Sequence, residues 1–225
     1  MSVRVAVLIL SAVLLPGTFG CSGAEFGESA ALPQGKHASL TDEFAAGRPL
    51  ALPADMPLNL YDSQRRATAA GRAESSAAPE GRAACRVSAD GVGTAAAEFQ
   101  LGHVLDNRGQ GPLKVTARFA VDYACRVEAD PDDRSKPDDK LGLRLFIRDS
   151  NRRVLQGMML TEVGQATGPR EWSGRESHAL DVVLEPGLAY YFVLAGKASV
   201  TGTEVSTASA EIDVRSFALE LVPRE

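Results

Sequence analysis

The chain has 225 residues, enough for one folded domain with appended segments. Its 24 Lys and Arg residues against 29 Asp and Glu residues give a net charge of −5 at pH 7. Because no basic excess is present to bind phosphate groups, this composition argues against nucleic acid as a partner.

Residues 1–20 have the pattern of a signal peptide. Arg4 gives a positive start, residues 5–15 are apolar or small throughout, and Pro16 and Gly17 end the run. An apolar run of about 11 residues is roughly half of what a helix needs to cross a bilayer, so a permanent membrane span is the weaker interpretation. We therefore expect residues 1–20 to be removed and the rest of the chain to be exported.

Residues 14–21, Leu-Leu-Pro-Gly-Thr-Phe-Gly-Cys, resemble the processing site of bacterial lipoproteins. The resemblance implies that Cys21 becomes the lipidated first residue, with the membrane as a partner through that anchor. Ser22 behind it then implies an outer-membrane or cell-surface address. The alternative is ordinary secretion, with cleavage at or after Gly20.

Residues 21–82 are rich in Ala, Gly, Ser, Pro, Arg and Glu, and their apolar residues follow no sustained period. This composition predicts a low-complexity tether that is mostly disordered. The stretch 50–61 is an exception, because its Leu, Met and Tyr residues could dock on the folded part as an extended strip.

From residue 83 to 225 the apolar residues recur with period two, the spacing that sends alternate side chains to opposite faces of a strand. The clearest stretch is 113–127, where the odd positions are apolar from Leu113 to Val127. The same alternation predicts strands in seven other places: 85–89, 99–105, 141–147, 153–163, 178–184, 188–195 and 208–221. In the last of these the apolar parity changes after Val214, which predicts a bulge near Arg215.

Turn-forming residues separate these stretches, and no pattern of helical length lies between them. They occur at 89–93, 107–112, 149–151 and 185–187, and in the acidic segment after Asp130. About eight short strands without crossover helices predict an all-β domain, an antiparallel β-sandwich of immunoglobulin-like or jelly-roll topology.

Three cysteines are present. If Cys21 carries lipid, Cys85 and Cys125 remain as an even pair, and both fall on the apolar face of a predicted strand. An exported chain seldom keeps its thiols reduced, so we expect a disulfide between them, with two buried free thiols as the alternative.

Candidate chemical sites are few. The acidic segment 128–140 has enough carboxylates for calcium, but it lacks EF-hand spacing and also fits a solvated connection between strands. His103 and His178 lie within apolar alternation without ligand-spaced partners, which is typical of packed, hydrogen-bonded histidines. No nucleophile elbow, phosphate-binding loop or zinc motif is present. The sequence therefore predicts no metal, no cofactor and no enzyme.

Trp172 is the single tryptophan, placed in a Gly-Pro-Arg-Glu-Trp-Ser-Gly segment that we interpret as a loop. An exposed aromatic there could stack on a sugar or anchor a partner, although covering one end of the core is the more common role. The leading hypothesis is a non-catalytic cell-envelope or secreted module for binding, adhesion or assembly, with an unidentified protein or glycan partner. The alternative is a carbohydrate-binding domain that uses Trp172, and a hydrolase is the third.

Overall fold

The computed structural model describes residues 38–39, 49–129, 140–164, 170–204 and 206–224. Within these ranges ten strands form one continuous sheet, and no helix is present. The strands are β1 (Ala38–Ser39), β2 (Leu50–Leu52), β3 (Leu60–Ala78), β4 (Arg82–Asp106), β5 (Leu113–Ala129), β6 (Lys140–Asp149), β7 (Val154–Val163), β8 (Arg170–Leu184), β9 (Ala189–Gly202) and β10 (Thr207–Pro223). Among the residues described, nothing has the helical length and apolar content that crossing a bilayer requires.

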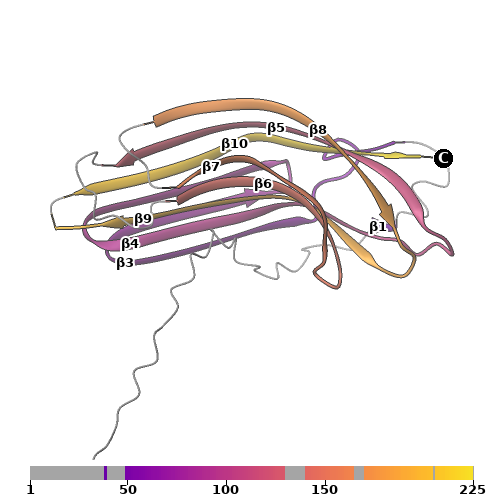
Figure 1. Ribbon diagram of the computed structural model, residues 1–225, viewed down its shortest axis with the longest axis horizontal. Coiled ribbons are helices and arrows are strands. Elements are labelled where there is room, and N and C mark those ends of the chain that lie inside the picture. The colour runs from indigo at the N-terminus through magenta and orange to yellow at the C-terminus, as the bar shows by residue number, and fades with distance from the viewer. Residues whose placement is uncertain (1–37, 40–48, 130–139, 165–169, 205, 225) are drawn as a thin grey trace, which may run out of the picture.

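The sheet folds over on itself into a sandwich. Its main path runs β7-β6-β9-β4-β10-β5-β8, and β3 pairs with β4 as a long hairpin. All pairings are antiparallel except the short contact of β1 with β4. Figure 1 shows β8, β5 and β10 along one side of the molecule and β9, β4 and β3 along the other. The antiparallel β-sandwich predicted from the sequence is confirmed.

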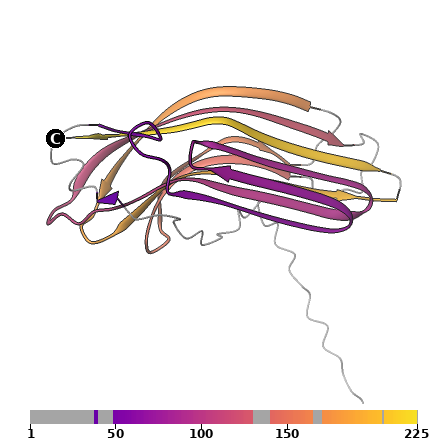
Figure 2. The ribbon, with the colours of Figure 1, turned by 180° about the vertical axis from the view of Figure 1, so that it is seen from behind.

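Strand β4 joins the two layers, because it changes partner halfway along its length. Its residues 83–90 pair with β10, whereas residues 93–106 pair with β9. The hairpin partner β3 follows β4 through both halves with one register shift, between Ala69 and Gly71. Seen from behind, this hairpin lies on the near side of the molecule (Figure 2).

The core lies between the two layers and comes from the alternation seen in the sequence. On β5 the odd positions from Val115 to Val127 are buried, and the neighbouring even positions are exposed or half-buried. The bulkiest fully buried side chains are aromatic, and the rings of Phe119 and Phe217 stack with centroids 6.2 Å apart. Burial of these alternating rows supplies the hydrophobic stabilisation of the fold.

The predicted bulge at Arg215 is confirmed. The pairing of β10 with β5 shifts between Val214 and Ser216, so Arg215 is an extra residue with no partner on β5. Buried side chains stand at even positions up to Val214 and at odd positions from Phe217 onward. One inserted residue thus keeps both halves of β10 facing the core.

One of the predicted turns is absent from the structure. The turn expected at 89–93 is instead the point within β4 where the partner changes, and Gly91 there has φ +99°, a left-handed conformation that favours glycine. The predicted stretches 85–89 and 99–105 are therefore parts of one strand.

The tether predicted for residues 21–82 is also corrected, because β2 and β3 fall within it. Leu50, Leu52, Leu58 and Leu60 are at most 4% exposed, so this stretch belongs to the folded part, as its apolar residues suggested. Its polar composition reflects the edge position of β3, which has only β4 beside it over most of its length. The predicted signal peptide and the predicted lipid attachment site, Cys21, lie outside the described residues.

A second, smaller hydrophobic cluster lies on the outer face of β4, β9 and β6. It consists of Leu60, Val104, Phe146, Val193 and Ala195, all of them buried. The guanidinium carbon of Arg144 lies 4.8 Å from the centre of the Phe146 ring, and that of Arg148 lies 4.8 Å from the centre of the Tyr191 ring. Both are cation–π contacts.

Candidate polar binding site

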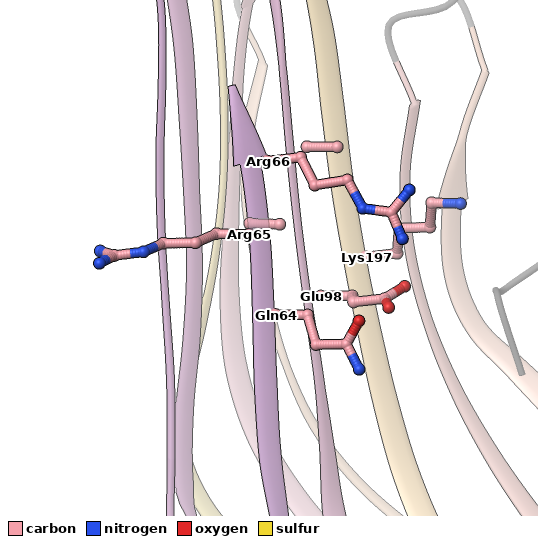
Figure 3. Close-up of a pocket in the computed structure, with 7 residues that line it drawn as sticks. Gln64, Arg65, Arg66, Glu98 and Lys197 are labelled. Atoms are coloured by element: carbon pink, nitrogen blue, oxygen red, sulfur yellow. The ribbon is translucent and has the colours of Figure 1, made fainter. Parts of the chain in front are cut away.

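A small polar hollow lies on the outer face of β3, β4 and β9. It has a volume of about 170 Å3, and its polar lining comes from Gln64, Arg66, Glu98 and Lys197 (Figure 3). Pockets that enclose drug-sized ligands measure roughly 300–1,000 Å3, so this hollow is suited to one polar ring or one unit of a longer ligand.

The register of the three strands places these side chains together. Gln64 of β3 stands directly across from Glu98 of β4, and Glu98 stands directly across from Lys197 of β9. Cross-strand neighbours on one face lie about 5 Å apart, so the three form a row. Arg66 is paired with Ala96 in the adjacent row, and the small alanine side chain leaves the space that the longer side chains surround.

The strands beneath the hollow are held close together in the core. Gly196 of β9 has no side chain, and the ring of Phe99 occupies its place, because an added Cβ would lie 2.3 Å from that ring. Lys197 and Glu98 are the sequence neighbours of Gly196 and Phe99, and their side chains lie on the outer face of the same strands. Binding groups carried on packed strands are held more rigidly than groups on loops.

Arg65 also borders the hollow but points the opposite way. In Figure 3 its guanidinium extends to the other side of β3 from Arg66, as alternation along a strand requires. Arg65 therefore provides a natural comparison: it has the same charge on the same strand with the opposite orientation.

Two charged groups of the hollow are not engaged with the rest of the described chain. On the outer face of the other layer, cations and carboxylates pair directly: Arg86 with Glu211 at 2.6 Å, Arg118 with Glu220 at 3.0 Å, and Arg175 with Asp122 at 2.7 Å. Within the described ranges, neither Arg66 nor Glu98 forms an ion pair or a side-chain hydrogen bond. A guanidinium and a carboxylate are thus left available to a ligand.

A larger hollow, of about 450 Å3, lies between residues 51–54 and the strands β10, β5 and β8. Its lining includes five alanines, and its charged groups, Arg118 and Glu220, are paired with each other. His178 also lines it and is hydrogen-bonded to Glu176. It offers space but few uncommitted polar groups to orient a ligand.

Trp172 lies in strand β8 and not in a loop, which corrects the interpretation from the sequence. Its side chain is half-buried against the core, and its indole N–H donates a hydrogen bond to the Thr161 hydroxyl of β7 at 3.1 Å. Strands β7 and β8 are the two ends of the sheet path, so this bond links its free edges. That position favours the covering role over stacking on a ligand.

A hydrogen-bonded chain that the sequence did not reveal lies on the inner side of β5 and β8. The Tyr123 hydroxyl donates to Glu176 Oε1 at 2.7 Å, and His178 Nε2 lies 2.8 Å from Glu176 Oε2. Burial and the hydrogen bond to Glu176 raise the pKa of Tyr123 above its usual value. The same Tyr123 hydrogen bond, together with His178, lowers the pKa of Glu176.

The two histidines were predicted to be packed residues with hydrogen bonds. His178 is hydrogen-bonded to Glu176, and His103 is buried.

The disulfide predicted between Cys85 and Cys125 is wrong: both are free, buried thiols. Each faces the core, but β10 lies between their strands: Ile212 is paired with Cys85 of β4 on one side and with Cys125 of β5 on the other. Two strand spacings put their Cα atoms roughly 10 Å apart, beyond the 4.4–6.8 Å that a disulfide spans. Burial raises the pKa of both thiols, that of Cys125 to about 12.

No cluster of three His, Cys, Asp or Glu side chains suited to a metal ion is found in the part of the chain that the structure describes. Most of the acidic segment 128–140, the candidate calcium site, lies outside those residues.

Comparisons with known proteins found no match by sequence and only distant matches by structure. No protein-family description and no curated protein matches it. Among solved structures, it is similar to the Endo-D glycoside hydrolase domain of Streptococcus pneumoniae R6, with 10% identity, TM-score 0.28 and coverage of 70% of this chain and 21% of that one. It is also similar to the family 11 carbohydrate-binding module of Clostridium thermocellum, with 10% identity, TM-score 0.26 and coverage of 76% and 94%. A carbohydrate-binding module of the β-sandwich superfamily matches with 14% identity, TM-score 0.24 and coverage of 88% and 64%. Similarity at this level defines no family.

Proposed function

We propose that this chain is a non-catalytic binding module whose ligand is a carbohydrate, held in the hollow of Gln64, Arg66, Glu98 and Lys197. The observation that carries the proposal is the pair of unengaged, oppositely charged groups, Arg66 and Glu98, around a small cavity. A sugar hydroxyl both donates and accepts hydrogen bonds, so neighbouring hydroxyls can donate to a carboxylate and accept from a guanidinium. Hydrogen bonds to ionised groups are the stronger kind.

The absence of catalysis belongs to the same proposal. Hydrolysis of a glycosidic bond ordinarily uses two carboxyl groups that flank it, roughly 5–9.5 Å apart. The described lining of the hollow contributes one carboxylate, that of Glu98. Prolonged incubation of a bound oligosaccharide with the protein is expected to release no shorter product, and a product would reinstate the hydrolase hypothesis.

The test of binding is a glycan array followed by calorimetry with paired variants. Glu98→Gln and Arg66→Gln are each expected to weaken binding about tenfold, the effect of one charge-assisted hydrogen bond. Arg65→Gln serves as the matched control, since it removes the same charge from the same strand on the opposite face. If both Arg variants bind as the parent does, the hollow is not the site.

Trp172 is the competing site. Trp172→Phe keeps an aromatic ring, although a smaller one, and removes the N–H that bonds to Thr161. We expect this variant to bind glycans with parental affinity and to lose about 1 kcal/mol of unfolding free energy. Loss of binding at unchanged stability would move the site to Trp172.

We also propose that the module is exported and anchored through Cys21. The signal-like residues 1–20 support this. Intact mass from the native host tests it: a chain that begins at Cys21 with added acyl groups is the expected result, and an unmodified chain that begins elsewhere would indicate free secretion.

A further inference from the structure

The charges around the hollow indicate which kind of carbohydrate it takes, an inference that rests on the proposed function. We infer that the ligand is an acidic glycan, one whose sugar units carry carboxylates. The hollow contributes the cations Arg66 and Lys197 against a single carboxylate, Glu98. A neutral sugar can hydrogen-bond to both the carboxylate and the guanidinium, but it brings no negative charge to balance the excess of cations in the hollow.

The arrangement of the four side chains separates the two kinds of contact. In the view of Figure 3 the cationic heads of Arg66 and Lys197 are directed to one end of the hollow, while Glu98 and Gln64 lie at the other. A sugar carboxylate at the cationic end can form two parallel hydrogen bonds with the Arg66 guanidinium, whose planar fork matches a carboxylate. The ring hydroxyls then reach Glu98 and Gln64, and the two carboxylates are kept apart.

The surrounding face has the same sign of charge. By register and alternation, the outer face of β3, β4, β9 and β6 also carries Lys140, Arg144 and the buried Arg148. With Arg66 and Lys197 these cations outnumber the carboxylates of the same face, which are Asp62, Glu98 and Asp106. The chain as a whole has a net charge of −5, and this face therefore departs from the average of the molecule. Clustered cations raise the local concentration of an anionic ligand.

The experiment compares acidic oligosaccharides with their neutral counterparts. Galacturonate, alginate and hyaluronate oligosaccharides are each titrated beside the carboxyl-reduced form of the same chain. We expect at least one acidic form to bind about tenfold more tightly than its reduced form. That preference should decrease at high salt, because exposed charges are screened.

The variants assign the preference to a residue. Arg66→Gln should abolish the difference between acidic and reduced forms, whereas Arg65→Gln should preserve it. Glu98→Gln should weaken both forms alike, since that carboxylate contacts hydroxyls in both.

The outcomes separate this inference from the proposed function. Equal affinity for acidic and reduced forms, or a preference for the neutral form, overturns the acidic ligand and leaves the carbohydrate site in place. Binding only of neutral glycans on the array would likewise overturn the acidic ligand and leave the carbohydrate site in place. Absence of binding to every glycan overturns both.

Discussion

At the scale of single residues, Arg66 and Glu98 of the hollow differ from the charged pairs on the outer face of the other layer in what they contact. Arg86, Arg118 and Arg175 all pair with carboxylates on a solvated face, where such pairs contribute little to stability. Arg66 and Glu98 are diagonal neighbours across β3 and β4 but do not pair with each other. The proposed function assigns these two separated charges to the ligand.

The Tyr123–Glu176–His178 chain predicts a pH-dependent contribution to stability. The folded pKa of Glu176 lies below its unfolded value, so the carboxylate stabilises the fold above the unfolded pKa, and this stabilisation is lost as pH falls through the folded pKa. Tyr123→Phe is expected to lower the unfolding free energy by about 1 kcal/mol at neutral pH. Urea titrations should show the two proteins converging in acid, and a difference that persists there would contradict this account.

At the scale of the strands, neighbours decide what the buried cysteines can do. Because Ile212 separates Cys85 from Cys125, the two cannot form a disulfide. We therefore expect that treating the protein with a reductant leaves its mass unchanged. Both thiols are buried with raised pKa values and should resist a thiol reagent in the native protein but react once it is unfolded. Modification of either thiol in the native protein within seconds would contradict its burial.

The bulge in β10 gives a second expectation for a strand. Deletion of Arg215 would shift Phe217, Leu219 and Leu221 by one residue and turn them to the solvent side. These side chains are fully buried, so we expect the deletion to prevent folding, seen as loss of a cooperative thermal transition. Arg215→Ala keeps the residue count and should change stability by no more than about 0.5 kcal/mol. Equal behaviour of the two variants would show that the register is not set there.

At the scale of the whole molecule, the folded unit begins earlier than the period-two pattern indicates. A chain that starts at residue 83 lacks β2, β3 and the buried Leu50, Leu52, Leu58 and Leu60. Losing a buried leucine typically costs about 2–5 kcal/mol. Losing four therefore costs about 8–20 kcal/mol, as much as the roughly 5–15 kcal/mol by which an ordinary domain is stable. We expect that chain to be unfolded by circular dichroism and one that starts at residue 49 to be folded. Folding of the shorter chain would mean that β2 and β3 are dispensable.

The sequence alone determined which face of each strand is buried, because alternation is a local property: the odd positions of 113–127, the parity change at Arg215 and the all-β class all follow from it. The tertiary structure decided which strands are neighbours. Cys85 and Cys125 were predicted on the correct face of their strands, but the disulfide predicted between them is absent. Trp172 was predicted in a loop, although it lies in β8 and is paired with Cys125 of β5. The hollow could not be predicted for a related reason. Gln64 and Glu98 come from the two strands of one hairpin, whose first strand lacks the apolar alternation that predicts a strand, and Lys197 joins their row only through the long-range pairing of β4 with β9.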